Sequence, residues 1–244
     1  MLITIKPPGC TINQYIEKFK QENDIKKLCF CGRLDPMARG KLLLLTNNEC
    51  KYMNLYLNNP KTYEFEIVFG IQTDTDDPLG ILESIDIINP NSTPLLLSNI
   101  YEKLIHQINH YNCTNFNQKF HHYSSKKIKG FPLWYYKKNN IAVERPEHSV
   151  EISSITINQL VQYDFTDWKN NIIEQINSID KTKDFNQIII IKQWENLNLH
   201  TIYALPISIH VSSGFYIRQF VRDLSDIIQY PLMAYDINRT NIIL

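Results

Sequence analysis

The sequence predicts an α+β protein whose central sheet is mostly antiparallel and is flanked by helices. Several segments alternate apolar and polar residues as half-buried strands do, and a few others repeat their apolar residues with a helical period. These segments do not follow one another as strand, helix, strand, which is the order that a parallel sheet requires. With 244 residues, 43% of them hydrophobic, the chain can bury a sizeable core, and we expect one domain over residues 1–244.

The predicted elements of the N-terminal half begin with a short strand over residues 2–5. Thr11 then fits the N-cap of a helix, because Gln14 stands three residues later, as in a capping box. Residues 63–69 alternate as a half-buried strand with one aromatic and aliphatic face. The apolar positions between residues 97 and 108 recur with helical period and predict a helix.

The C-terminal half contains further predicted strands and one amphipathic helix. The strands are expected over residues 150–157, 185–191 and 205–211. Residues 217–228 place their apolar side chains on one stripe of a helix. The other face of this helix shows Arg218, Arg222 and Ser225. For residues 161–183 we expect an irregular or helical insertion.

The net charge is zero, which is unusual for a protein that holds a polyanion. Residues 111–143, called the basic segment below, contain no Asp or Glu. Six lysines stand there among aromatic residues: Lys119, Lys126, Lys127, Lys129, Lys137 and Lys138. Cations interleaved with aromatic planes suit contact with phosphates and stacking of bases, so the basic segment is a candidate RNA-binding insertion. A solvated lysine-rich loop is the alternative.

Several classes of protein are disfavoured by composition and spacing. Five cysteines without a Cys-x-x-Cys pair suggest neither a disulfide framework nor a zinc site, and we expect them to be reduced and buried. His106 and His110 have the spacing of a zinc protease without its Glu, and residues 74–77 lack the Gly and Glu of a calcium loop, so solvated helix and turn are expected there. Apolar runs fall far short of the roughly 18 residues that span a membrane. We expect no metal, no membrane and an intracellular, by default cytoplasmic, location.

The most informative segment is residues 31–40, which read CGRLDPMARG and precede four consecutive leucines from residue 42. This segment holds one carboxylate, that of Asp35, in a glycine-bounded turn in front of a buried segment. An ionised carboxylate held in a pocket can act as a nucleophile. Taken alone, the segment could equally be an ordinary Asp-Pro turn.

Further blocks stand in order around this segment. They are KPPGCT at residues 6–11, KTY at 61–63, FGIQTDTDDPLG at 69–80, YSSKKIKG at 123–130 with Gln118 upstream, SSGFYIRQFVRDL at 212–224 and NRT at 238–240. Any one block is weak, but the ordered set covers nearly the whole chain. It resembles the TruB family of pseudouridine synthases, which isomerise a uridine in the T loop of tRNA.

The resemblance implies a pseudouridine synthase fold with an active-site cleft across the sheet, and a reaction that needs no cofactor. Asp35 would be the nucleophile, attacking either C6 of the uracil or C1′ of the ribose. Arg218 would be its counter-charge, since a guanidinium can hold a carboxylate bidentately and offset its burial. Tyr63 would stack on the flipped uracil, and its hydroxyl is one candidate for the proton transfer; Tyr216 is a second candidate, for taking the C5 proton. Core packing is the alternative for both tyrosines.

The resemblance also implies an RNA partner, the T-arm stem-loop of tRNA, from which the target uridine must be flipped out. The residues expected to bind RNA are Arg33, Lys61, Tyr123, Lys126, Lys127 and Lys129. We expect the chain to act as a monomer.

The chain departs from the family pattern at three places. Phe30 stands where many members carry His, and residues 137–140 read KKNN where the family has Ala-Arg-x-Gly. The sequence ends at Leu244, so we expect a catalytic domain without the C-terminal PUA domain of many relatives. One rival is a non-catalytic RNA-binding or RNA-folding module, which has no use for a costly buried ion pair. A metal-dependent hydrolase is the other rival, and it lacks its ligands.

Overall fold

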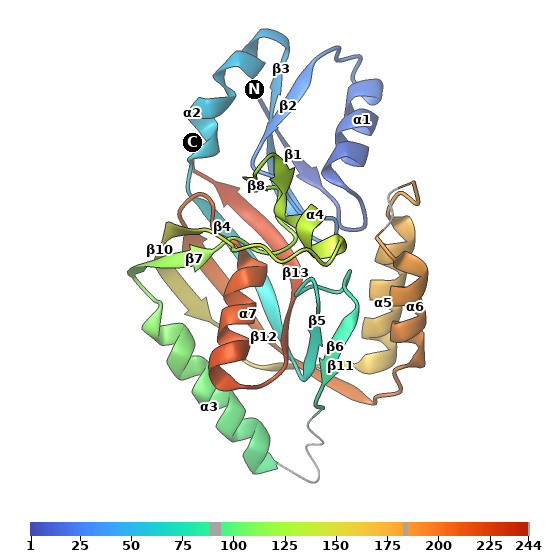
Figure 1. Cartoon of the computed structure of the whole chain (residues 1–244), viewed down its shortest axis with the longest axis vertical. Helices are drawn as coiled ribbons and strands as arrows, with labels where there is room; N and C mark the ends of the chain where they lie inside the picture. Colours follow the sequence, from blue (N-terminus) through green and yellow to red (C-terminus); the bar gives the residue numbers. More distant parts are fainter. Residues whose placement is uncertain (88–93, 183–184, 244) are drawn as a thin grey trace.

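The computed structural model describes residues 1–87, 94–182 and 185–243 (Figure 1). Its central sheet contains β1 (Leu2–Lys6), β2 (Leu28–Cys31), β3 (Arg39–Thr46), β4 (Lys61–Phe69), β7 (Thr114–Lys119), β10 (Glu147–Ile157), β11 (Val161–Asp164), β12 (Thr201–Val211) and β13 (Leu232–Ile242). The main order is β1-β3-β13-β4-β12-β10-β7, with β2 paired to β3 and β11 to β12. Only the β13–β3 pair is parallel among these described strands, so the predicted α+β class with a mostly antiparallel sheet is confirmed.

Helices cover both faces of the sheet (Figure 1). On one face lie α3 (Pro94–His110) and α7 (Ile217–Ile228), and on the other lie α5 (Phe165–Ser178) and α6 (Gln187–Asn196). At the β1–β3 end, α1 (Ile12–Glu22) covers one face, while η1 (Asn47–Tyr52) and α2 (Met53–Leu57) cover the other. Smaller elements are the hairpins β5 (Ile71–Thr73) with β6 (Leu82–Ile85) and β8 (Lys127–Ile128) with β9 (Phe131–Pro132), and α4 (Leu133–Lys138). None of the described helices is long and apolar enough to cross a membrane.

Strand β4 lies between β13 and β12 and carries the predicted alternation. Tyr63, Phe65, Ile67 and Phe69 enter the core under α3 and α7, whereas Val68 enters the core under α5 and α6. Burying one such side chain contributes about 1.5–3 kcal/mol before conformational entropy is subtracted. Tyr63 is therefore carried by a strand that is held on both edges and packed on both faces.

The predicted start of α1 is also confirmed. Gln14 N donates to Thr11 Oγ1 and Thr11 N donates to Gln14 Oε1, each at 3.1 Å, which is the reciprocal pair of a capping box. For residues 161–183, the helical alternative is confirmed over residues 165–178, which form α5 after the short strand β11, and residue 183 lies outside the described residues. After β11, Asp164 caps α5 by accepting from Thr166 N at 2.8 Å and Asp167 N at 3.1 Å.

The strand expected over residues 185–191 is wrong. Most of this stretch belongs to α6, in which Ile190 and Trp194 are buried while Ile188 is exposed. The isoleucines favour a strand by propensity, but a spacing of four from Ile190 to Trp194 places both on one helix face against α5. Tertiary packing on that face outweighs the local preference.

The expectation of buried cysteines holds for one residue only. Cys31 is buried, Cys113 is exposed, and Cys10, Cys29 and Cys50 are partly exposed; all five are free thiols. Cys113 follows α3 in a tight turn with φ +56°, where its thiol donates to Ser153 O.

Candidate active site

The loop that carries Asp35 connects β2 to β3 and is fastened at both ends. At its start, Arg239 on β13 donates from Nη2 to Gly32 O at 3.1 Å. Gly32 has φ +84°, and a Cβ there would lie 3.2 Å from Arg239 Nη1, so both backbone conformation and space favour glycine. At its far end, Lys6 Nζ donates to Pro36 O at 3.3 Å and to Ala38 O at 2.7 Å.

Burial changes the proton affinity of Lys6, which has no exposed surface. Desolvation lowers its pKa to about 8, although the nearby Cys10 and Asp35 raise it. The ammonium is therefore a costly but well-bonded anchor for the loop, because it donates to the carbonyls of Pro7, Pro36 and Ala38.

Asp35 meets Arg218 at a cavity of about 310 Å³. Arg218 Nε donates to Asp35 Oδ2 at 2.8 Å, and the aspartate side chain keeps 33% of its surface exposed. The pair joins a loop near the N-terminus to the second residue of α7, so the resemblance correctly brought these two side chains together. The cavity is large enough for one nucleoside and keeps the carboxylate accessible.

The predicted bidentate grip of Arg218 on Asp35 is wrong. The guanidinium is divided between partners: Nη1 donates to Thr75 O at 2.9 Å and lies 3.7 Å from Asp77 Oδ2. Burial opposes the charge on Arg218, but Asp35, Asp77 and Asp76 raise its pKa on balance. Arg218 thus stays charged and is fixed by the turn after β5 as firmly as by Asp35.

Tyr63 and Tyr216, the two tyrosines expected to act in the reaction, both line this cavity. Tyr63 is 8% exposed, so its ring belongs both to the core and to the cavity wall. Tyr216 is the N-cap of α7 and is clamped by Gln118: Tyr216 N donates to Gln118 Oε1 at 2.9 Å, and Gln118 Nε2 donates to Tyr216 O at 3.1 Å. Burial and the nearby Asp35 raise the pKa of Tyr216, which therefore keeps its proton.

Three of the expected RNA-binding residues also line the cavity, in different states. Arg33 is exposed, with its guanidinium 5.4 Å from the ring centre of Phe30. Tyr123 donates its hydroxyl proton to Asp74 Oδ2 at 2.6 Å. Lys61 is buried and donates to Leu57 O at 3.3 Å.

The charge of Lys61 is poorly placed for a phosphate. Burial and the nearby Arg239 lower its pKa to about 8. Its ammonium also donates to Asn59 O and lies 3.5 Å from Ser213 Oγ, so it ties the loop before β4 to the segment before α7.

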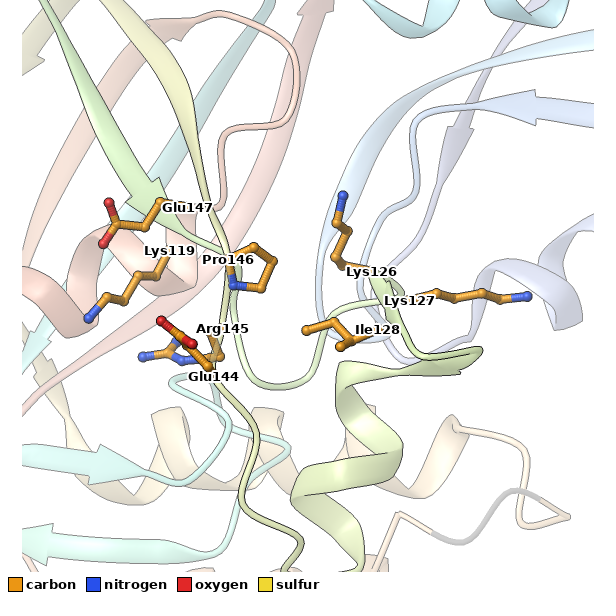
Figure 2. Close-up of a pocket in the computed structure, with 8 residues that line it drawn as sticks. All are labelled: Lys119, Lys126, Lys127, Ile128, Glu144, Arg145, Pro146 and Glu147. Carbon is orange, nitrogen blue, oxygen red and sulfur yellow. The ribbon is translucent and has the colours of Figure 1, made fainter.

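Lys126, Lys127 and Lys129 are exposed and lie outside this cavity. Lys126 and Lys127 line a second hollow of about 750 Å³, together with Lys119, Ile128, Glu144, Arg145, Pro146 and Glu147. Figure 2 shows Lys126 and Lys127 on one side of this hollow and Lys119 and Arg145 on the other. Lys129 stands with Gly130 in the two-residue turn of the β8–β9 hairpin, at φ +47° and +88°.

Sequence reasoning missed the role of residues 74–79, called the acidic turn below. A solvated turn is wrong, because Asp76 and Asp77 are each only 3% exposed. Asp77 faces Arg218, and Asp76 accepts hydrogen bonds from Arg222 and from His121. The run of carboxylates and the motif block at residues 69–80 both mark this turn, but neither shows that its carboxylates are buried. Within the described residues, no group of three or more His, Cys, Asp or Glu side chains is arranged to hold a metal ion.

The chain is similar to known proteins over most of its length. Residues 20–175, well over half of it, match the family model described as TruB family pseudouridylate synthase (N terminal domain). The tRNA pseudouridine synthase B of Lactobacillus johnsonii is 26% identical over 242 residues, which cover 99% of this chain and 67% of that relative. The tRNA pseudouridine synthase B of Malacoplasma penetrans is 29% identical over 220 residues, which cover 90% of this chain and 74% of that relative.

Solved structures share the fold. A chain from the crystal structure of a Cbf5-Nop10-Gar1 complex matches 98% of this chain, with a TM-score of 0.54 and 13% identity. A chain from the structure of an H/ACA RNP bound to a substrate RNA containing 2′-deoxyuridine matches equally far, with a TM-score of 0.52 and 13% identity. This chain spans 47% and 45% of the length of those two neighbours.

Proposed function

The chain belongs to the TruB family of pseudouridylate synthases, and from this membership we propose that it isomerises a uridine of tRNA to pseudouridine. The proposed target is uridine 55 in the T loop, within the T-arm stem-loop. We propose that the chain acts on it as a monomer. The observation that carries the proposal is the Asp35–Arg218 pair at a nucleoside-sized cavity whose lining includes Tyr63 and Tyr216. Such an RNA also fits the intracellular location expected from the sequence.

The reaction needs a nucleophile and proton transfer but no external reagent. The C1′–N1 bond breaks, a C1′–C5 bond forms, C5 loses a proton and N1 gains one, so atoms and electrons balance within the nucleotide. In this proposal Asp35 forms the transient covalent bond to the nucleotide, at C6 or at C1′. Arg218 stays charged, so it holds the carboxylate in place through a hydrogen bond and does not transfer its proton to it.

The tyrosines and the basic segment have separate proposed roles. Tyr63 stacks on the extruded uracil, and Tyr216 lies beside Asp35. Because Tyr216 keeps its proton, it acts in the transfer at C5 only by giving up its own proton as it accepts that of C5. Extruding the base costs a few kcal/mol, which contacts to the rest of the stem-loop must offset. The exposed Lys126, Lys127 and Lys129 are the proposed phosphate contacts, with Arg33 at the cavity mouth.

Asp35→Asn tests the proposal. The amide keeps the shape of the carboxylate but cannot be the nucleophile, so tritium release from C5-labelled uridine in a tRNA transcript should vanish. RNA affinity should stay within about threefold, because the substituted group carries the chemistry and not the binding. Asp226→Asn, an exposed change on α7, is the matched control.

Residual turnover of Asp35→Asn within about tenfold of the wild type would overturn the assignment of the nucleophile. Tight RNA binding by a wild-type chain that releases no tritium would instead favour the non-catalytic module. Loss of tritium release on addition of a chelator would favour a metal-dependent reaction.

A further inference from the structure

A second buried ionic network lies beside the cavity, and its members do not line it. His121 has no exposed surface, and its Nε2 lies 2.9 Å from Asp76 Oδ2. Arg222 on α7 donates from Nε to the other oxygen of Asp76, from Nη2 to Thr73 O at 2.9 Å and to Glu83 Oε2 at 2.7 Å. Asp76 is only 3% exposed, and burying its charge costs free energy that the hydrogen bonds from Arg222 and His121 offset.

The hydrogen bonds define the tautomer of His121. Tyr123 N donates to His121 Nδ1 at 3.1 Å, so Nδ1 carries no proton and Nε2 donates to Asp76. Burial, with the positive Arg218 nearby, lowers the pKa of His121 well below its usual value and keeps the ring neutral. A neutral imidazole has one donor and one acceptor, and both are in use.

The two ends of the imidazole hold two parts of the proposed active site. On the Nδ1 side, residues 123–125 form part of the cavity wall, and Ser124 N donates to His121 O at 3.1 Å. On the Nε2 side, Asp76 belongs to the acidic turn, whose Thr75 O accepts from Arg218. The ring is thus a rigid spacer between the wall and the turn that fixes Arg218.

We propose that His121 is a positioning residue for the isomerisation, which sets the place of the cavity wall at residues 123–125 relative to the Asp35–Arg218 pair. The inference rests on the proposed function. Asp76 and Arg222 anchor the ring by fixing its tautomer, and the amide of Tyr123 is the group that the ring positions. A displacement of about 1 Å at such a wall is enough to slow the chemical step strongly.

Two near-isosteres separate the two contacts of the ring. His121→Asn places an amide oxygen near the position of Nδ1, where it can accept from Tyr123 N, but it is too short to reach Asp76. His121→Gln places its amide near the position of Nε2, where it can donate to Asp76, and leaves Tyr123 N without its acceptor. His121→Ala removes both contacts.

Asp76→Asn provides an independent test. With an amide oxygen facing Arg222, its NH2 group faces His121 Nε2, which can accept only if the ring proton moves to Nδ1. A protonated Nδ1 would then confront the N–H of Tyr123, so this distant change should also release the cavity wall.

The single-turnover rate at saturating stem-loop and the KM are measured separately. His121→Ala, His121→Gln and Asp76→Asn should lower the rate at least about tenfold and change KM less than about threefold, while His121→Asn stays within about threefold of the wild type. The double change of His121→Ala with Asp76→Asn should be no slower than His121→Ala alone, because both act through one contact. His106→Ala, on the exposed side of α3, is the control and should change neither quantity.

Equal single-turnover rates for wild type and His121→Ala, with a lowered melting temperature, would show that the ring only packs and would overturn the inference. If the alanine variant does not fold, His121→Asn and His121→Gln still decide, because equal rates for these two have the same consequence. If the wild-type chain does not isomerise uridine, the proposed function is wrong. Hydrogen exchange at the Tyr123 amide then tests separately whether His121 positions the cavity wall. Protection kept in His121→Asn and lost in His121→Gln supports the positioning contact, and equal protection overturns it.

Discussion

Replacing Arg218 by lysine tests how the ion pair at the cavity is built. The guanidinium reaches Asp35 through Nε at 2.8 Å and Thr75 O through Nη1 at 2.9 Å, and it lies 3.7 Å from Asp77. An ammonium is a single point of charge on a flexible stem, and it cannot reproduce a planar fork that addresses partners on two sides. Arg218→Lys therefore keeps the positive charge and loses directed bonds.

The size of the effect follows from the contacts that are lost. At a residue only 5% exposed, at least one charged hydrogen bond disappears, which costs about 1.5–3 kcal/mol of unfolding free energy. If the transition state at Asp35 loses a comparable amount of stabilisation, the activation free energy rises by more than the roughly 1.4 kcal/mol that corresponds to a tenfold change in rate. We expect kcat to fall at least about tenfold, with KM much less affected.

The assay combines single-turnover tritium release with urea unfolding of the same preparations. Arg39→Lys is the matched control, because Arg39 also holds a carboxylate through two directed bonds, to Asp236 at 2.6 and 2.7 Å, but does not line the cavity. If Arg218→Lys keeps kcat within about threefold of the wild type, directed bonds to Asp35 and the acidic turn are unnecessary and the reasoning is refuted. A large loss of stability with unchanged kcat would place Arg218 in the scaffold and not in the reaction.

Further outcomes are expected at the cavity and at the basic segment. Tyr63→Phe should bind RNA as the wild type does, because the ring face survives, whereas Tyr63→Ala should lose turnover; equal turnover of the two would make Tyr63 a bystander. Replacing Lys126, Lys127 and Lys129 by Glu should raise KM and flatten its salt dependence while saturated turnover changes much less, and an unchanged salt slope would place the RNA elsewhere. Burial lowers the pKa of Lys61 from 10.5 to about 8, so between these values the unfolded chain binds more protons and stability should rise with pH. Urea midpoints at about pH 8 and 9.5 test this, and Lys61→Met should reduce the rise.

Periodicity predicted most of the fold because most elements are decided by which side chains they bury. β4 and α7 each have one strongly apolar face, and both appear where the pattern places them. The exception is α6, where a run of isoleucines has no clear period and only the contact of Ile190 and Trp194 with α5 decides for a helix. A pattern shows a face to be buried but not what will cover it.

The residues of the candidate site were predictable where a motif carries them, and their partners were not. Asp35 and Arg218 come from separate motifs, and the resemblance correctly paired them. The sequence predicts a solvated turn at Asp77, because its contact with Arg218 joins positions 141 residues apart that no local pattern links. The division of the guanidinium between Asp35 and the acidic turn could not be inferred for the same reason.

The polar face of α7 shows most clearly what a single sequence hides. An amphipathic helix ordinarily turns its polar side to water, yet Arg218 and Ser225 are buried and Arg222 is largely covered. Arg218 and Arg222 face the acidic turn, whereas Ser225 accepts from Gln72 on β5 and donates to Tyr230 O. Polar surfaces thus bury each other on this side, while the apolar stripe packs on α3 and the sheet. The consequence for the proposed reaction is mechanical. Because α7 is held on both sides, Arg218 cannot move without also moving the acidic turn and His121. Arg218 in turn holds Asp35, so in the proposed reaction the carboxylate is already in position before RNA binds.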